Sequence, residues 1–119
     1  MIARRSVAAM VALLSAAPAF ATESLTCTPP GKAEPLVRFS IGHAAEPTIS
    51  SAYFETDGAE VTVAVSQSWV DKDRMWVNLG DDGLENVIVQ FRANGSGERP
   101  HGTLVYKGKT YKVRCVYDG

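Results

Sequence analysis

The sequence predicts a small all-β domain, an antiparallel β-barrel or β-sandwich of about seven to eight strands with one disulfide. Three observations support this fold class. Apolar and polar residues alternate at a period of two in several short segments, which is the pattern of half-buried strands. Turn-forming pairs such as Asp57-Gly58 separate these segments. After residue 21, no window has the i, i+3, i+4, i+7 spacing of an amphipathic helix, so the pattern is that of one all-β domain.

The expected strands follow one another along the chain with short connections. In order they are residues 36–41, 49–55, 59–70, 74–79, 84–93, 102–106 and 109–117. The segment 59–70 alternates most clearly, and if it is one continuous strand, Trp69 shares an inward face with Val61, Val63 and Val65.

The last two segments form a predicted β-hairpin. With Gly108-Lys109 as a two-residue type II′ turn, Tyr106 faces Tyr111 and Leu104 faces Val113. Each inward residue then meets another inward residue, so the turn and the apolar pattern agree on the register.

The first 21 residues have the features of a secretory signal peptide. Arg4-Arg5 precede the short apolar run Ser6–Leu14, and Ala19-Phe20-Ala21 fits the small-x-small cleavage rule. The apolar run is too short for a transmembrane segment. We therefore predict a periplasmic or secreted protein, cleaved near Ala21, with residues 22–119 as one β domain.

The charge balance bears on the partner. Cleavage near Ala21 would remove two arginines and no acidic residue, which changes the formal net charge from −1 to −3. A mildly acidic domain is a poor match for nucleic acid, which favours basic partners.

The two cysteines are expected to form a structural disulfide. Cys115 shares the inward face of the last strand with Val113 and Tyr117, and Cys27 is its one possible partner. An exported protein meets an oxidising environment, and no C-x-x-C motif indicates redox catalysis. Closing so long a loop is expected to stabilise the fold by about 4 kcal/mol.

Motifs for catalysis or metal binding are lacking. His43 and His101 lie far apart in turn-like segments, and no spacing supplies the three or four ligands of a zinc site. The turn aspartates, Asp71, Asp73, Asp81 and Asp82, do not follow a calcium-loop formula. The chain has no G-x-S-x-G motif and no phosphate-binding loop. We therefore expect a protein that is not an enzyme, with no cofactor and no metal.

Trp76 is a candidate contact residue with two possible placements. Its period-two neighbours Arg74 and Asn78 are polar, which would place Trp76 on the outer face. If Leu79 pairs with Leu84 across the Gly80–Gly83 turn, Trp76 instead belongs to the core. We favour the core placement, and expect Trp69 in the core as well.

The last hairpin is rich in cations. It contains Lys107, Lys109, Lys112 and Arg114, of which the last two share an outward face. Such residues can be a solvated, aggregation-blocking edge. The alternative is a basic patch for an acidic site on a partner.

The segment from Cys27 through Gly31 to Val37-Arg38-Phe39, with a late Cys115, resembles the small bacterial envelope inhibitors of C-type lysozyme. Ser50-Ser51-Ala52-Tyr53 is similar to the Ser-Gly-x-x-Tyr loop of that family, with Ser51 in place of the glycine. The resemblance implies an eight-stranded antiparallel barrel that inserts a loop into the lysozyme cleft, where serine and basic side chains meet the catalytic carboxylates. It assigns Ser50, Ser51 and Tyr53 to partner binding.

These observations predict an exported, non-enzymatic binding domain whose partner is a protein, with a lysozyme-like enzyme as the named candidate. The candidate contact residues are Ser50, Ser51, Tyr53, Trp76, Lys112 and Arg114. One alternative is a carrier of a small apolar ligand lined by Trp69, Trp76 and Phe91. Another is a structural or adhesion module of the envelope.

Overall fold

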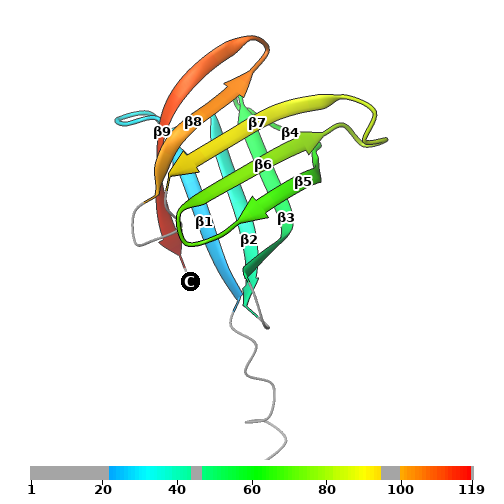
Figure 1. Cartoon of the computed structure of the whole chain (residues 1–119). Helices are drawn as coiled ribbons and strands as arrows, with labels where there is room; N and C mark the ends of the chain where they lie inside the picture. Colours follow the sequence, from blue (N-terminus) through cyan, green and yellow to red (C-terminus); the bar gives the residue numbers. More distant parts are fainter. Residues whose placement is uncertain (1–21, 44–46, 95–99, 119) are drawn as a thin grey trace, which may run out of the picture.

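The computed structural model describes residues 22–43, 47–94 and 100–118, and the predicted signal peptide lies outside them. These residues form an all-β fold of nine antiparallel strands in one curled half-barrel sheet (Figure 1). The fold class expected from the sequence is confirmed. The strands are β1 (Thr22–Thr28), β2 (Leu36–His43), β3 (Pro47–Thr56), β4 (Ala59–Val61), β5 (Ala64–Val70), β6 (Arg74–Gly80), β7 (Val87–Asn94), β8 (His101–Tyr106) and β9 (Lys109–Asp118). None of these elements is a helix of the length and apolar character needed to cross a membrane.

The strand order makes the sheet curl. It runs β4-β3-β2-β1-β9-β8-β7-β6-β5, so neighbours in the sheet are consecutive in the chain except for β1 and β9. The two edge strands, β4 and β5, are themselves consecutive and are joined through residues 62–63 alone. Because a two-residue link cannot span an open sheet of this width, the two edges must approach each other.

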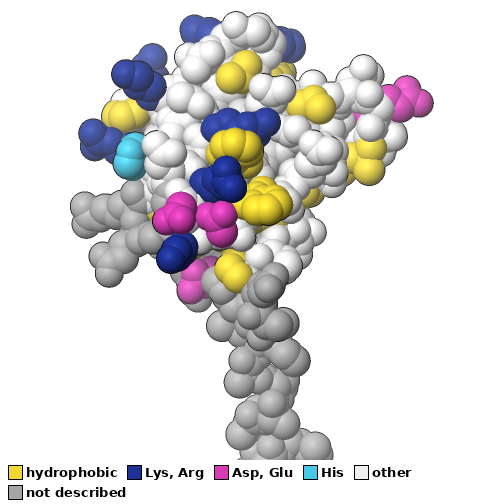
Figure 2. Space-filling model, in the orientation of Figure 1, with side chains coloured by type: hydrophobic (Ala, Val, Ile, Leu, Met, Phe, Trp, Pro, Cys, Tyr) yellow, Lys and Arg dark blue, Asp and Glu magenta, His cyan; other side chains and the backbone are white. Residues whose placement is uncertain are grey.

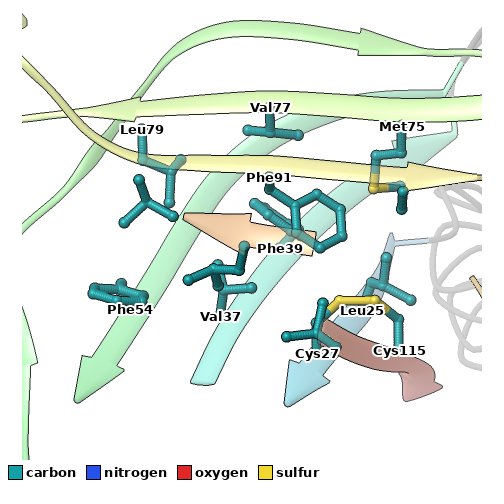
Figure 3. Close-up of a cluster of buried hydrophobic side chains, with 14 of the residues drawn as sticks. Leu25, Cys27, Val37, Phe39, Phe54, Met75, Val77, Leu79, Phe91 and Cys115 are labelled. Carbon is teal, nitrogen blue, oxygen red and sulfur yellow. A yellow bond between two sulfur atoms is a disulfide. The ribbon is translucent and has the colours of Figure 1, made fainter. Parts of the chain in front are cut away.

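The concave side of the sheet holds one hydrophobic core (Figure 3). Phe39 of β2 and Phe91 of β7 meet there with ring centroids 5.0 Å apart, although three strands separate β2 from β7 in the sheet. Phe54 and Tyr106 form a second aromatic pair at 4.9 Å. The fully buried side chains come from seven strands and include Leu25, Val37, Ile41, Met75, Val77, Leu79, Val89, Leu104 and Val113.

The predicted disulfide is confirmed. Cys27 on β1 and Cys115 on β9 are direct cross-strand partners, and their sulfur atoms are bonded. Both residues are buried in the core, so the bridge joins the N-terminal and C-terminal strands from inside the sheet (Figure 3).

Two strand assignments differ from the expectation. Residues 22–28 form β1, which the sequence pattern did not identify because only Leu25 and Cys27 are inward apolar residues there. The expected strand 59–70 is two strands, because its first part pairs with β3 and its second part with β6.

The last hairpin turns one residue earlier than expected. Lys107 and Gly108 have φ values of 49° and 74°, so they are the central residues of a type I′ turn. Leu104 therefore faces Tyr111, and Tyr106 faces Lys109. The predicted register is wrong by two residues, a shift that leaves each side chain on its expected face.

Candidate functional site

Trp76 lies on the outer face of the sheet, so the expected core placement is wrong. Its cross-strand partner is Arg92, whereas the next residue, Val77, pairs with Phe91 inside the core. The Trp76 side chain is 44% exposed. The expected pairing of Leu79 with Leu84 does not form, since Leu79 pairs with Val89.

The connection between β6 and β7 explains the change of face. Asp81 holds residues 81–86 as a closed loop: its carboxylate accepts hydrogen bonds from the Glu85 amide at 2.9 Å and from Asn86 Nδ2 at 3.0 Å. These bonds lower the pKa of Asp81, with the Asn86 bond as the largest cause. Compared with a tight turn at Gly80–Gly83, this longer loop shifts the pairing of β6 with β7 by an odd number of residues. An odd shift places Trp76 on the opposite face of the sheet.

Trp69 is also exposed, which corrects its expected core placement. The ladder between β5 and β6 is irregular between Val65 and Gln67, so the inward alternation of Val65 does not continue to Trp69. Trp69 is 56% exposed and lies directly opposite Trp76.

Two arginines and these two tryptophans form a stack, which we call the Arg–Trp ladder: Arg92, Trp76, Arg74 and Trp69. The Arg74 guanidinium lies 4.9 Å from the Trp76 ring centroid and 5.3 Å from that of Trp69. Arg92 lies 5.6 Å from the Trp76 centroid. Figure 2 shows hydrophobic and Lys or Arg side chains side by side near the middle of the face that β5, β6 and β7 present. Cation–π attraction orders all four side chains.

Asp71 holds one end of the ladder. Its carboxylate accepts a 2.8 Å hydrogen bond from Trp69 Nε1 and lies 3.4 Å from Arg74 Nε. It also accepts the backbone N–H groups of Asp73 and Arg74 at 2.8 and 2.9 Å, which fixes the β5–β6 turn. The hydrogen bond from Trp69, followed by that from the Asp73 amide, lowers the pKa of Asp71 to about 2.

A second network anchors Arg92 at the other end. Arg92 Nη1 donates to the carbonyl oxygens of Phe91 and Val77, at 2.8 and 3.3 Å. Arg92 Nη2 donates to Asn78 Oδ1 at 2.8 Å, and Asn78 Nδ2 donates to Gln67 Oε1 at 3.2 Å. Beside this network lies a hollow of about 370 Å³, lined by Gln67, Ser68, Trp69, Trp76, Asn78 and Arg92. We call it the ladder hollow.

The predicted residues Lys112 and Arg114 belong to the same outer face as Trp76. Thr103 of β8 pairs with both Arg92 and Lys112, so one cross-strand row joins Trp76 to Lys112. The adjacent row runs from Arg74 through Asn94 and His101 to Arg114. The outward-facing positions of strands β6 to β9 carry one carboxylate, Asp118, and the cations Arg74, Arg92, Lys112 and Arg114, whereas Lys109 alternates with the inward residues of β9. This outer surface of β6–β9 is therefore basic.

Ser50, Ser51 and Tyr53 lie elsewhere, within strand β3. Ser50 Oγ donates to the Ser40 carbonyl at 3.1 Å, where the β2–β3 pairing is irregular. Tyr53 donates to Glu55 Oε1 at 3.0 Å, and this bond is the largest cause of its raised pKa. In the sheet, β2 and β1 separate β3 from the basic strands, so these three residues do not join the row of Trp76 and Lys112.

A second, larger hollow lies at β8 and β9. Its volume is about 910 Å³, and its lining includes Lys112, Arg114, Val116, Tyr117, Pro30 and Pro100. Val116 is 64% exposed, which makes it the most exposed large hydrophobic side chain of the described residues. We call this hollow the β9 groove.

The interior ligand site of the carrier alternative is not formed by its three residues. Phe91 is fully buried in the core, while Trp69 and Trp76 are on the outside. These side chains therefore line no common cavity.

No metal centre is found among the side chains that the structure describes, which include His101 and the turn aspartates. No group of three or more His, Cys, Asp or Glu side chains in the described part of the chain is placed to hold a metal ion. His101 is exposed as the first residue of β8, and His43 is the last residue of β2.

The sequence reasoning missed Arg74, Arg92 and Gln67 as site residues, and it considered Trp69 only as a lining residue of an interior ligand site. A signal for part of this site was present, because Arg74, Trp76 and Asn78 alternate at period two on a strand whose other face is apolar. Arg92 and Gln67 come from other strands, and only the register brings them beside Trp76.

Comparison with known proteins found no relative. No protein-family model matches the chain, and neither a curated protein nor a solved structure matches it.

Proposed function

We propose that this chain is an exported, non-enzymatic binding domain that docks on a protein through the Arg–Trp ladder and the neighbouring basic strands. The observation that carries the proposal is the exposure of the ladder, in which two half-exposed tryptophans are held in place by arginines. Tryptophan and arginine are the residue types most enriched among energetic hot spots of protein interfaces. Side chains ordered before binding lose less conformational entropy on binding.

The charge distribution supports an acidic contact site on the partner. The chain as a whole has a formal net charge of −1, while the outward-facing positions of strands β6 to β9 carry four cations and one carboxylate. A local basic face favours acidic side chains, and arginine pairs with carboxylates through two parallel hydrogen bonds.

The named candidate partner is a C-type lysozyme. The support is the resemblance around Cys27, Gly31 and Val37-Arg38-Phe39, together with electrostatics. Lysozymes of this class are basic overall and have catalytic carboxylates in their cleft. An acidic domain would be steered toward such an enzyme, and its basic face would then meet the carboxylates.

The test is a cell-wall clearing assay with the oxidised, exported protein titrated against a C-type lysozyme. We expect stoichiometric inhibition that Trp76→Ala weakens at least about tenfold, the effect of losing a hot-spot side chain. The matched control is Val87→Ala, which removes a 51% exposed hydrophobic side chain at the far end of β7.

A double Ser50→Ala, Ser51→Ala variant separates the two surfaces. If this double variant loses inhibition and Trp76→Ala does not, lysozyme remains the partner, but the contact is made by β3 and not by the outer face. If the unmodified protein neither binds nor inhibits lysozyme at a large molar excess, lysozyme is excluded as the partner.

Export belongs to the same proposal. The support is the Arg4-Arg5, apolar and Ala19-Phe20-Ala21 pattern, together with a disulfide, which forms in oxidising compartments. The intact mass of the protein recovered from the export compartment should fit a chain beginning at Thr22. A mass that retains residues 1–21 would contradict the cleavage.

The β9 groove favours a second candidate function, the transport of a small apolar ligand. At about 910 Å³ its volume is in the range of sites for drug-sized molecules, and it contains Val116 and two prolines. Native mass spectrometry of the exported protein should then show a bound small molecule, which Val116→Asp would release. An unliganded mass together with unchanged stability after exposure to apolar extracts would contradict the carrier function.

A further inference from the structure

The ladder hollow contains hydrogen-bond donors that are turned toward solvent by a fixed network. We infer that it is a carboxylate-binding subsite in which Gln67 and Arg92 donate to the ligand and Trp69 and Trp76 form its walls. This inference rests on the proposed role of the outer face in binding, and it names the chemical group that the face recognises.

Arg92 determines which atoms donate and which accept in the hydrogen bonds that link Arg92, Asn78 and Gln67. A guanidinium group has only donors, so Arg92 Nη2 fixes Asn78 with its oxygen toward the arginine at 2.8 Å. Asn78 must then present its amide nitrogen to Gln67, and it donates to Gln67 Oε1 at 3.2 Å. Gln67 is in turn fixed with its oxygen inward, which leaves the Nε2 group at the open end of the relay.

The count of donors and acceptors is uneven in this hollow. Within the part of the chain that the structure describes, no acceptor takes the two N–H groups of Gln67 Nε2. Arg92 has five N–H groups, of which three donate to Val77, Phe91 and Asn78, so Nε and one Nη2 hydrogen remain. The amide oxygens of Asn78 and Gln67 each accept one hydrogen bond, so the free N–H groups of the relay outnumber the lone pairs that remain on these two oxygens.

The ladder hollow is positively charged, because its lining includes the guanidinium of Arg92 and no carboxylate. Asp71, the nearest carboxylate on the ladder, is occupied by Trp69, Arg74 and the turn amides. The polarised relay from Arg92 through Asn78 strengthens the Gln67 donors, because hydrogen bonds in a chain reinforce one another.

This chemistry favours a carboxylate over other ligands. A neutral sugar would leave the positive charge of Arg92 without a counter-charge, and the free groups of the relay are mainly donors, which an anion matches better. A phosphate dianion would be matched by more than the one cation of this hollow. A planar monoanion that accepts two or more hydrogen bonds fits the donors present. Its source is either a small organic acid or an Asp or Glu side chain of a protein.

The test uses the full oxidised protein labelled with ¹⁵N and titrated with sodium acetate at constant ionic strength. The side-chain amide signals of Gln67 and Asn78 and the Nε–H signal of Arg92 are observed. We expect saturable shifts of these signals with acetate and none with acetamide, which has the same shape and no charge. Non-saturable shifts, or equal shifts with acetamide, would overturn the subsite.

Two substitutions by glutamate form a matched pair. Gln67→Glu replaces the free donors by a charge of the same sign as acetate and should weaken acetate binding more than tenfold. Thr110→Glu adds the same charge at an exposed position of β9, three strands from β6 and outside the hollow, and should weaken it less than threefold. Equal losses in both variants would mean that acetate senses only the overall charge, and the inference would be wrong.

A peptide pair distinguishes the two sources of the carboxylate. Acetyl-Gly-Glu-Gly-amide should shift the same signals, and acetyl-Gly-Gln-Gly-amide should not. Acetate binding without binding of the glutamate peptide would assign the subsite to free organic acids and overturn its role in protein recognition. These titrations are made without a partner protein, so a negative lysozyme assay does not affect their result. If the protein inhibits lysozyme but does not bind acetate, the subsite is refuted and the proposed function is not.

Discussion

Trp69 on β5 is the cross-strand partner of Trp76 on β6, and the guanidinium of Arg74 lies over both indole rings. The two tryptophans thus form one ordered surface, in which the arginine fills the space that solvent would otherwise occupy. Arg74 itself is held by Asp71, which also receives the indole N–H of Trp69. Each exposed side chain of the ladder is therefore positioned by another, so this surface is ordered in the free protein.

The first prediction concerns the energy of this contact. Arg74→Ala should lower the free energy of unfolding by about 1 kcal/mol, since exposed cation–π contacts contribute about 0.5–1 kcal/mol each and the surface ion pair adds little. Urea titration followed by tryptophan fluorescence measures the change at constant m-value. Arg74→Lys should recover only part of the loss, because lysine lacks the planar guanidinium.

The control for this prediction is Lys112→Ala on the same outer face. Lys112 is exposed, and no ring contact or ion pair involving it is found among the described residues, so its removal should change stability by less than about 0.5 kcal/mol. Similar losses for Arg74→Ala and Lys112→Ala would show that the ladder contributes no specific energy.

The second prediction concerns acid. The folded-state pKa of Asp71 is about 2, below the ordinary value of 3.8, so its bonds stabilise the fold fully above about pH 4 and are lost as the pH falls through 2. As the pH falls through about 2, the folded-state Asp71 carboxylate becomes protonated, so the tryptophan near-UV circular dichroism should weaken there while the core remains folded. The ¹³C titration of the Asp71 carboxyl measures the midpoint directly.

Asp71→Asn tests whether this carboxylate is the cause. The variant keeps the size of the side chain and removes its charge, so the near-UV signal should no longer change as the pH falls through about 2. The hydrogen bond from Asn86 lowers the pKa of Asp81, which holds the loop between β6 and β7 and does not contact the tryptophans. Asp81→Asn should therefore leave the tryptophan signal unchanged. An acid transition that survives in Asp71→Asn would exclude Asp71 as its origin.

The fold could be predicted from the sequence where the period of two continued without interruption. Val37, Phe39 and Ile41 alternate cleanly and are all buried, and Cys115 lies on the inward face that its neighbours indicated. The disulfide followed from the predicted export, from the presence of two cysteines and from the inward face of Cys115. These inferences depend on local pattern alone, which the tertiary structure did not override.

The outer site could not be predicted in full because it depends on register. The irregularity after Val65 and the closed loop that starts at Asp81 each reverse the face of a tryptophan. Neither feature has a strong local signal, since Gly80–Gly83 reads equally well as a tight hairpin turn. One residue of slippage exchanges core and surface, so Trp69 and Trp76 were both assigned to the wrong side.

The third prediction concerns the disulfide. Cys27→Ala with Cys115→Ala should lower the free energy of unfolding by about 4 kcal/mol, because the bridge closes a loop with a sequence separation of 88 residues. Urea unfolding of the double variant and of the reduced protein should give similar losses. A loss below about 1 kcal/mol would indicate that the β1–β9 pairing alone joins the two ends of the chain.

The fourth prediction concerns Gly102, which lies opposite Ala93 across β7 and β8. A Cβ atom at this position would overlap the carbonyl oxygen of Arg92 and lie 2.6 Å from the Cα of Ala93. Both neighbours are backbone atoms that cannot rotate away, so Gly102→Ala should cost about 3 kcal/mol, the upper end of overpacking penalties. Any relief requires β7 to move, which would displace Arg92 from Trp76 and weaken partner binding as well.

Gly83→Ala is the control for this prediction. Its added Cβ atom would meet its nearest neighbour at 3.7 Å, so the substitution should change stability by less than about 0.5 kcal/mol. Equal effects of the two substitutions would contradict the close approach of β7 and β8.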